Sequence, residues 1–450
     1  YVITATNALG QISTATYDPK WGKLLSETGP DGLTTSYNYD AFGRLQTTIM
    51  PQGWIITEAY NWDIDVVNGT VHYHTTGHSG KPDVKVWYDI LDREKKKQVE
   101  GFQNQWITIN TTYDARGNVA AATAPYKSGE TVLTSTNTYD NYNRLANTSN
   151  TFGTVTTAYT YDISGYLTTT TTNAAGQVSS KITDACGRTV SATDYGGTLT
   201  YTYNSQGNVT QVNRGSTVLI LNEYDAYARQ TKLTDINAGV TQYAYDALGQ
   251  MTSEISPLTQ TTAFTYDLAG RLTQRVGPEG TTTNEYFPSG SGASTNKLKK
   301  TTGFSGNLEE YTFDTYGRVG TKKLTIDGIA YTTTYGYNTY NDVTSIAYPS
   351  GFTLNSAYDA NGYLNTLKNG NNTVTIFTNT GMNGLDQYTG YSLGNGKSST
   401  NTYYFGIPTR YFTTGTQDLN LNWNYSSGNL TSRNDAIKGK TETFTYDNLN

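Results

Sequence analysis

Along most of the chain, small polar residues alternate with aromatic or aliphatic ones over short stretches. In residues 34–39 and 198–203, Thr, Ser or Asn occupies every second position and Tyr or Leu often stands between them. This period of two is typical of a β-strand, whose side chains point alternately to its two faces. Each stretch ends in a polar segment that often contains glycine, which indicates a tight turn. The pattern predicts an all-β fold made of short strands and many turns.

The segments that end the strands repeat a motif, Tyr-Asp-x-x-Gly-Arg-Leu, in which x is any residue. Consecutive copies at Tyr203, Tyr224, Tyr245 and Tyr266 begin 21 residues apart. Other clear or weaker copies begin at Tyr17, Tyr39, Tyr88, Tyr113, Tyr139, Tyr161, Phe313, Tyr337, Tyr358, Tyr425 and Tyr446, and degenerate ones at Tyr60, Thr183, Tyr286, Phe377 and Tyr404. About twenty units therefore run end to end. We interpret residues 1–450 as one continuous repeat array.

The motif is suited to form the corner of a β-hairpin. The Asp carboxylate, as in Asp40, can accept a backbone N–H two residues further on and so close an Asx-turn. The following Gly, as in Gly43, can adopt the positive φ that ends such a turn at little steric cost. We assign this structural role to Tyr39, Asp40, Gly43, Arg44, Tyr113, Asp114, Gly117, Tyr139, Asp140, Arg144, Tyr161, Asp162, Gly165, Tyr245, Asp246, Gly249, Tyr266, Asp267, Gly270, Arg271, Asp314, Gly317, Arg318, Tyr358, Asp359 and Gly362.

A second turn closes each unit, so that one repeat forms two strands of about seven residues. An isolated hairpin is only marginally stable in water, whereas side-by-side stacking pairs the edges of neighbouring hairpins. About twenty hairpins form a ribbon on the order of 190 Å long, which must curl because strand twist accumulates. The predicted fold is therefore a tandem array of β-hairpins in a spiralling, curled antiparallel sheet. Composition leaves open whether its middle is hollow or filled.

Two regions interrupt the regular spacing. Residues 61–87 belong to a unit that runs 28 residues from Tyr60 to Tyr88, and residues 287–300 include the Gly- and Ser-rich segment from Pro288 to Ser294. Small polar residues in such a run are typical of flexible connections. We expect both regions to be insertions in the array, and the second to be a flexible surface loop.

The motif and its spacing resemble the YD repeat of RHS proteins, of insecticidal toxin-complex components and of the animal teneurins. The resemblance covers essentially the whole chain, with clear copies such as Tyr39 to Leu45 and Tyr266 to Leu272. It implies a spiralling sheet that forms part of a large hollow shell, which in bacterial members encloses a C-terminal toxin domain. The implied partners are the remainder of the shell, a C-terminal cargo domain and a secretion machinery. The implied location is secreted or on the bacterial cell surface.

Bacterial members also tend to finish the shell with a segment whose aspartates cut the toxin free, with the signature Asp-Pro-x-Gly-Leu. Nothing similar closes this chain, and the string from Asp18 to Gly22 fits an ordinary repeat turn. The resemblance therefore transfers no cleavage residue. Because the chain starts and stops within a repeat, at Tyr1 and Asn450, we expect further YD repeats on both sides and an export signal beyond these residues.

Composition narrows the classes of protein. Aromatic residues make up 13% of the chain, whereas disordered segments are poor in them. The net charge of −6 and the scattered basic residues argue against a nucleic-acid surface. No apolar run approaches the ~20 residues of a transmembrane helix. The single cysteine, Cys186, excludes an internal disulfide, and it occupies the position of Phe42 in another copy, which favours a packing role.

Few residues offer other chemistry. The three histidines, His72, His74 and His78, are close in sequence, and in a strand His72 and His74 share a face with a spacing that suits zinc or nickel. The simpler interpretation is an exposed hairpin tip, because no fixed fourth ligand is visible. Residues 394–398 lack the first glycine and the following helix of a phosphate-binding loop. We predict no cofactor, no metal site and no catalytic residue.

Two functional hypotheses remain. The first is a non-enzymatic structural shell segment that encapsulates or carries a toxin or effector. The alternative is an aromatic-rich adhesin or carbohydrate-binding array whose tyrosines stack on surface glycans. Aromatic faces that line a groove would favour the adhesin, whereas tyrosines turned inward around a cavity would favour the shell.

Overall fold

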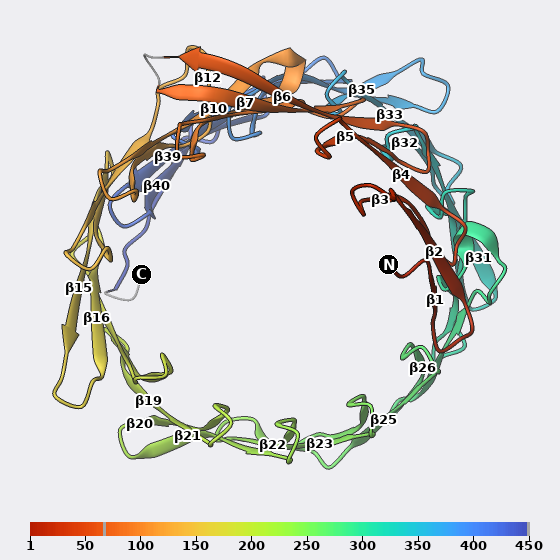
Figure 1. Ribbon diagram of the computed structural model, residues 1–450, viewed down its shortest axis with the longest axis horizontal. Helices are drawn as coiled ribbons and strands as arrows, with labels where there is room; N and C mark the ends of the chain where they lie inside the picture. The colour runs from red at the N-terminus through yellow and green to blue at the C-terminus, as the bar shows by residue number, and fades with distance from the viewer. Residues whose placement is uncertain (66–68, 448–450) are drawn as a thin grey trace.

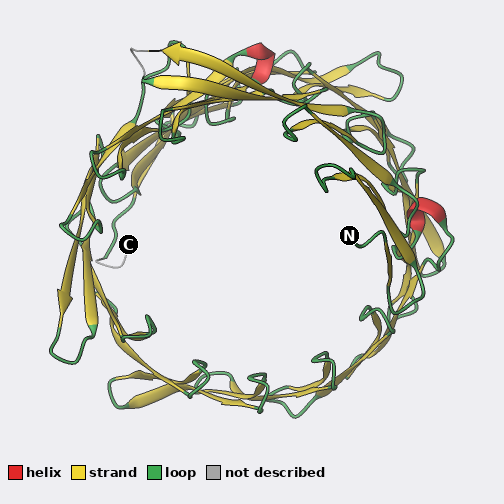
Figure 2. Ribbon diagram, in the orientation of Figure 1, coloured by secondary structure: helices red, strands yellow, loops and turns green. Residues whose placement is uncertain are grey.

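The computed structural model describes residues 1–65 and 69–447. Within them, 41 strands form one antiparallel sheet, and helix is limited to two 3-10 turns, η1 (Phe102–Asn104) and η2 (Gly292–Ser294) (Figure 2). This confirms the predicted all-β array of hairpins. Residues 66–68 of the first predicted insertion and residues 448–450 of the last repeat lie outside the described residues.

The strands of the first half are β1 (Thr4–Thr6), β2 (Ile12–Tyr17), β3 (Leu24–Thr28), β4 (Thr34–Tyr39), β5 (Leu45–Ile49), β6 (Ile55–Asp65), β7 (Thr70–His78), β8 (Val84–Tyr88), β9 (Glu94–Glu100), β10 (Trp106–Tyr113), β11 (Val119–Thr123), β12 (Tyr126–Lys127), β13 (Thr134–Tyr139), β14 (Leu145–Asn150), β15 (Gly153–Tyr161), β16 (Leu167–Thr172), β17 (Val178–Thr183), β18 (Thr189–Asp194), β19 (Gly197–Tyr203), β20 (Val209–Arg214) and β21 (Thr217–Tyr224). Those of the second half are β22 (Gln230–Asp235), β23 (Gly239–Tyr245), β24 (Met251–Ile255), β25 (Thr261–Tyr266), β26 (Leu272–Gly277), β27 (Gly280–Tyr286), β28 (Leu298–Thr302), β29 (Leu308–Phe313), β30 (Val319–Ile326), β31 (Ile329–Tyr337), β32 (Val343–Ala347), β33 (Thr353–Tyr358), β34 (Leu364–Asn369), β35 (Thr375–Met382), β36 (Tyr388–Leu393), β37 (Ser398–Tyr404), β38 (Ile407–Thr413), β39 (Gln417–Asn424), β40 (Asn429–Asp435) and β41 (Lys440–Thr443).

Each strand pairs with its neighbours in sequence, except that the two-residue β12 pairs with β10 while β11 pairs with β13. Two kinds of turn therefore alternate along the ribbon. We call the turns at the motif positions the YD turns and those at the opposite edge of the ribbon the far turns. For example, β4 begins after the far turn of residues 29–33 and ends at the YD turn of residues 40–44.

A β-bulge lies beside most YD turns. Between β4 and β5, Asn38 pairs with Thr47 and Tyr39 pairs with Leu45, so β5 contains one extra residue. A bulge of this kind bends the strand and increases its twist. The hairpin of β15 and β16 has no register shift at Tyr161, and it extends away from the wall in Figure 1. The repeated bulge is therefore a source of the curvature.

The ribbon winds through more than one circuit. Figure 1 shows the strands following one another around a ring until the later strands pass again beside the first ones. Hydrogen bonds that join the two passes connect residues 254 to 285 positions apart in sequence, as for Gly384 with Glu130 and Gln11 with Asn296. One circuit therefore takes about twelve or thirteen hairpins.

The wall of the ring is one sheet thick (Figure 1). The accessible surface is 25172 Å², whereas a compact protein of this mass exposes about 17,000 Å². Among the described residues, the buried hydrophobic side chains are Phe102, Ile107, Ala293, Met382 and Leu421. Phe102, Ala293 and Met382 belong to turns, or adjoin turns, that meet the other pass. What little core there is lies mainly between passes, and the described residues do not fill the middle of the ring.

In the structure, the first predicted insertion is part of the sheet and most of the second is a turn between β27 and β28. In its described part, the region of residues 61–87 lengthens the hairpin of β6 and β7 and continues into β8. Residues 287–297 form a closed YD turn, joined by the backbone bond from Phe287 N to Lys297 O. Ala293 and Thr295 are buried in this turn, whereas Pro288, Ser289 and Gly290 are exposed. The segment is therefore only partly at the surface, and its flexibility stays a prediction. A Gly- and Ser-rich composition does not reveal a neighbouring pass that covers the segment.

In some weak copies, the residue that precedes the YD turn differs from the one that the motif suggests. Met382, rather than Phe377, precedes the turn closed by Asn383 and Gln387. Trp423, rather than Tyr425, precedes the YD turn between β39 and β40. Its Nε1–H donates to Pro408 O at 2.7 Å, as the tyrosine hydroxyls of other copies do.

The conformation of the last residue in the YD turn leads to a paired prediction. Gly270 has φ 78° and Ala228, at the same position of another copy, has φ 65°. An L-residue in this region costs about 1–2 kcal/mol. Gly270→Val should therefore lower the melting temperature, and Ala228→Gly should raise it. Thermal unfolding followed by circular dichroism tests both, and unchanged melting of Gly270→Val would refute the role of the left-handed turn.

Candidate functional site

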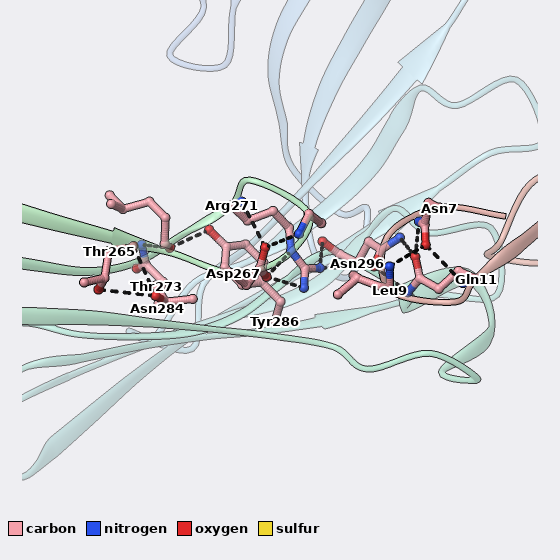
Figure 3. Close-up of polar contacts among 12 residues, drawn as sticks. Asn7, Leu9, Gln11, Thr265, Asp267, Arg271, Thr273, Asn284, Tyr286 and Asn296 are labelled. Atoms are coloured by element: carbon pink, nitrogen blue, oxygen red, sulfur yellow. Dashed lines mark hydrogen bonds and ion pairs between the residues drawn. The ribbon is translucent and has the colours of Figure 1, made fainter. Parts of the chain in front are cut away.

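The motif aspartate organises each YD turn. In the copy drawn in Figure 3, Asp267 Oδ1 accepts the backbone N–H groups of Ala269 at 2.9 Å and Arg271 at 3.0 Å. Its other oxygen, Oδ2, accepts Arg271 Nε at 2.7 Å. The predicted Asx-turn is therefore present, and the arginine of the motif closes it as an ion pair.

The same arginine and the following leucine hold the next hairpin. The Arg271 guanidinium lies 4.4 Å from the ring centroid of Tyr286, within cation–π range. The Tyr286 hydroxyl donates to Leu272 O at 2.9 Å. Every specified residue of the motif thus has a structural role, and three of them join one repeat to the next.

The other predicted motif residues follow this geometry with few exceptions. The same two backbone N–H bonds are accepted by Asp40, Asp114, Asp140, Asp162, Asp246, Asp314 and Asp359. Ion pairs with the motif aspartate are made by Arg44, Arg144 and Arg318. A positive φ is found at Gly43, Gly117, Gly165, Gly249, Gly270, Gly317 and Gly362. Hydroxyl bonds to a carbonyl of the preceding hairpin are made by Tyr39, Tyr113, Tyr139, Tyr245, Tyr266 and Tyr358.

Tyr161 departs from this set. Its side chain is exposed, and the hydroxyl of Tyr159 instead donates to the carbonyl of Leu145 at 3.0 Å. Arg144 lies 4.3 Å from the Tyr159 ring centroid and 5.8 Å from that of Tyr161. Because this hairpin lacks the bulge, the side chain that reaches the preceding repeat is two residues earlier. The motif does not reveal that the bulge is missing, so the sequence alone does not predict that Tyr159 takes the role of Tyr161.

In several copies, among them those of Asp184 and Asp40, the turn favours the ionised form of the motif aspartate. The side-chain hydrogen bond from Arg188, followed by the backbone N–H of Arg188, lowers the pKa of Asp184. At Asp40 the backbone N–H of Arg44 is the largest cause of a lowered pKa. At Asp184 and at Asp40, the turn needs the ionised carboxylate as a hydrogen-bond acceptor, and its hydrogen bonds in turn stabilise that ionised state.

A second set of contacts joins the two passes of the ribbon, and we call it the seam. At the seam, far turns of the first pass meet YD turns of the second. Gln11 and Asn296 exchange two side-chain amide bonds of 2.7 and 2.6 Å (Figure 3). Lys81 forms an ion pair with Asp342. Asn361 is buried and donates to Gly101 O at 3.0 Å.

Aromatic and backbone packing fills the rest of the seam. The Phe152 ring, in a far turn, stacks on Tyr425 with 5.7 Å between the centroids and contacts Tyr404 edge-on. The Tyr340 ring lies against Gly80, where it leaves no room for a Cβ atom. These contacts are local and side-chain specific, unlike the strand ladders.

Several seam residues occupy motif positions that elsewhere hold arginine. Asp342 takes that position in one copy and pairs with Lys81. Tyr363 takes it in the next, and its hydroxyl donates to Glu100 O at 3.4 Å. Burial, together with Asp386, raises the pKa of Tyr363 to about 12, so the hydroxyl keeps its proton. Asp359, which has no arginine partner in its turn, accepts the backbone N–H of Gln103 at 3.0 Å. Sequence analysis overlooked Asp342 and Tyr363 because they are departures from the motif, and it assigned Asp359 only a role in its own turn.

Comparison with known proteins agrees with this geometry. The family description RHS Repeat matches residues 17–53 and 245–282, each of which contains at least one YD turn. The chain therefore contains RHS repeats in these two segments. Its fold is similar to the crystal structure of TcdB2-TccC3, at 15% identity and a TM-score of 0.86, over 100% of this chain and 29% of that chain. A mutant Tc holotoxin pore of Photorhabdus luminescens is similar at 13% identity and a TM-score of 0.81, over 97% of this chain and 30% of that one.

The chain spans less than a third of the length of each of these two chains. At such identities the similarity concerns the fold alone. No curated protein matches the sequence. No helix within the described residues has the length and apolar character needed to cross a membrane.

The three histidines lie within strand β7 and not at a hairpin tip. The His72 ring stacks on Tyr88 at 5.0 Å, and its Nε2 lies 3.1 Å from Asp92 Oδ1. His74 Nε2 lies 2.7 Å from Glu58 Oε2, although the pair lacks the angle of a hydrogen bond. The histidines thus face separate partners, and no metal-binding group of three His, Cys, Asp or Glu occurs in the described part of the chain.

The central role of the motif aspartate can be tested at Asp267. Asp267→Ala removes the acceptor of two backbone N–H groups and the arginine partner, which should cost about 1–3 kcal/mol locally. Asp267→Asn keeps one acceptor oxygen and should cost less. Hydrogen exchange of residues 261–277 and the melting temperature are the measurements. Asp63→Ala, on the exposed part of β6, is the control, and equal effects at both sites would contradict the role of Asp267.

The lowered aspartate pKa values predict acid sensitivity. A carboxylate whose pKa is lower in the folded state stabilises the fold above its unfolded pKa of about 4 and loses this effect as the pH falls through the folded pKa. The destabilisation caused by Asp184→Asn should therefore be largest near neutral pH and shrink below about pH 4. Denaturant unfolding at several pH values measures it, with Asp63→Asn as the control for net charge. A difference that stays constant into acid would be inconsistent with the Asp184 assignment.

Proposed function

We propose that this chain is a non-enzymatic structural shell segment of a secreted or cell-surface bacterial RHS/YD-repeat protein. In this proposal it encloses or carries a toxin or effector domain that lies downstream. Its partners are the remainder of the shell, the cargo and a secretion machinery. The observation that carries the proposal is a wall one sheet thick that winds past a full circuit and is joined to itself at the seam.

The chemistry of the wall supports an enclosing role. Both faces of the sheet remain accessible, as the surface of 25172 Å² requires. Exposed Thr, Ser and Asn pairs cover much of the sheet, for example Thr202 with Thr210 and Thr402 with Thr409. Such a surface is polar without strong charge, and it offers a neighbouring folded domain few apolar contacts.

The arrangement of the aromatic residues gives less support to the glycan-binding alternative. Stacking on a sugar requires an open ring face. The motif tyrosines instead bond a carbonyl of the preceding hairpin, and several lie under an arginine, as Tyr245 does under Arg229 at 4.9 Å. Their rings are part of the joint between repeats.

The motif aspartates likewise give little support to an enzyme. Each one in the regular copies is committed to backbone N–H groups of its own turn, as Asp225 is to Tyr227 and Arg229. A catalytic carboxylate needs a position that the fold does not already use. The repetition of one geometry supports a structural role.

Protease protection tests enclosure directly. A small folded reporter, joined to the C-terminus of the full chain through a cleavable linker, should be cut at least about tenfold more slowly than the same linker and reporter alone. The double variant Lys81→Glu with Phe152→Ser weakens the seam and should lose protection while keeping its β-sheet circular dichroism. Cleavage at the rate of the free reporter would contradict the proposal.

A further inference from the structure

A cavity of about 330 Å³ lies inside the seam, between the two passes of the ribbon. One wall is the far turn of residues 124–133 in the first pass, and the other is formed by the YD turns of residues 383–387 and 404–406 in the second pass. Both walls belong to the described residues. The volume falls within the range of small-molecule binding sites. We call this space the seam cavity.

The far turns on either side of the seam cavity close the space between the passes with an aromatic ring. Phe102, in the preceding far turn, is 4% exposed, and the Phe152 ring, in the next one, stacks on Tyr425. The Tyr126 ring of the far turn between them does not line the cavity, and its hydroxyl instead accepts Asn110 Nδ2–H at 2.8 Å. The seam is therefore left open at this one of three consecutive far turns.

Backbone contacts hold the walls of the seam cavity in place. Gly384 lies against the far turn so closely that a Cβ atom would be 2.6 Å from Tyr126 Cα. The Gly384 N–H donates to Glu130 Oε2 at 3.1 Å. Gln387 Nε2–H donates to Gly406 O at 2.9 Å and so joins the two YD turns of the second wall. The cavity is thus formed before any ligand enters.

Glu130 gives the seam cavity a negative charge. Its Oε2 accepts the backbone N–H groups of Lys127 at 2.8 Å and of Gly384 at 3.1 Å. The Lys127 ammonium donates to Met382 O instead, and within the described residues no lysine or arginine forms an ion pair with Glu130. An ionised carboxylate has about four lone-pair positions, so Glu130 can accept a further charged donor.

Apolar and aromatic side chains line the cavity beside this carboxylate. Leu385 and Tyr404 are each 40% exposed although they lie at the seam. The ring centroids of Tyr404 and Phe405 are 4.6 Å apart, and Phe405 has the left-handed φ of 49°. Such a conformation is unfavourable for a bulky residue and recurs where proteins hold ligands. A carboxylate beside aromatic rings is the chemistry that recognises an organic cation.

We propose that the seam cavity binds a small organic ammonium ion. The ammonium group pairs with the Glu130 carboxylate, and the apolar part of the ligand lies among Leu385, Tyr404 and Phe405. Because the ligand contacts both passes, it stabilises the seam as it binds. This binding is independent of whether the shell encloses a cargo.

Three probes that share one ring and differ in charge test the proposal on the full chain. In isothermal titration calorimetry, phenethylammonium should bind with a Kd below about 1 mM. Phenethyl alcohol, which lacks the charge, should bind at least about fivefold more weakly, and phenylacetate, which carries the opposite charge, more weakly still. Absence of phenethylammonium binding, or equal affinity for the three probes, would overturn the proposal.

Two variants locate the binding. Glu130→Gln keeps an acceptor oxygen for the two backbone N–H groups and should weaken phenethylammonium binding at least about fivefold without changing the affinity for phenethyl alcohol. The matched control is Glu254→Gln, in β24, which does not line the seam cavity and should bind as the unmodified chain does. Leu385→Trp fills the cavity and should abolish the binding of every probe.

Thermal unfolding followed by circular dichroism provides a second readout. Each variant should show the β-sheet spectrum of the unmodified chain. Phenethylammonium should raise the melting temperature of the unmodified chain and of Glu254→Gln, but not that of Leu385→Trp. Undiminished phenethylammonium binding by folded Glu130→Gln or Leu385→Trp would place the ligand elsewhere and overturn the assignment.

Discussion

The architecture depends on the carboxylate of the motif aspartate. One oxygen orders the YD turn by accepting two backbone N–H groups, and the other holds the arginine that covers the tyrosine of the next hairpin. At Asp267 these functions occur within 3.0 Å of the carboxylate oxygens. A sheet with so little core cannot obtain its stability from burial in the usual way. It depends instead on a joint that recurs at nearly every repeat, which makes stability a sum of nearest-neighbour terms.

The contacts that join neighbouring hairpins along the ribbon and the contacts that join the two passes at the seam are made by different residues. The motif residues join each hairpin to its neighbours and are interchangeable between repeats. The seam uses the exceptions, such as Asp342 for Lys81 and Asp359 for Gln103, where a motif arginine is absent. Each exception gives up a contact along the ribbon and gains one across it. The register between circuits is therefore set in part by the positions at which a copy departs from the motif.

The sequence predicts the fold much better than it predicts the seam. Alternation and spacing are local, so strands, turns and the positive φ of Gly43 or Gly270 follow from the residues themselves. The seam joins residues about one circuit apart, and that distance depends on accumulated curvature, which no single repeat specifies. For this reason the sequence predicts a surface loop from Pro288 to Ser294 and does not reveal that Ala293 is buried. The contact made by Tyr159 instead of Tyr161 is unpredicted for a similar reason, because it follows from the absence of a β-bulge, which the motif does not encode.

The unusual composition follows from the same architecture. In a compact domain, one face of each strand is dry and accepts large aliphatic side chains. Here both faces meet water, so aliphatic residues on every strand would leave a continuous apolar surface. Charged residues are restricted as well, because side chains on adjacent strands are about 5 Å apart and like charges repel. Thr, Ser and Asn can bond to their counterparts on the next strand, as Thr312 does with Thr321, and tyrosine combines packing area with a hydroxyl for a backbone carbonyl. A chain with 15% charged and 13% aromatic residues is therefore the composition that a wall one sheet thick requires.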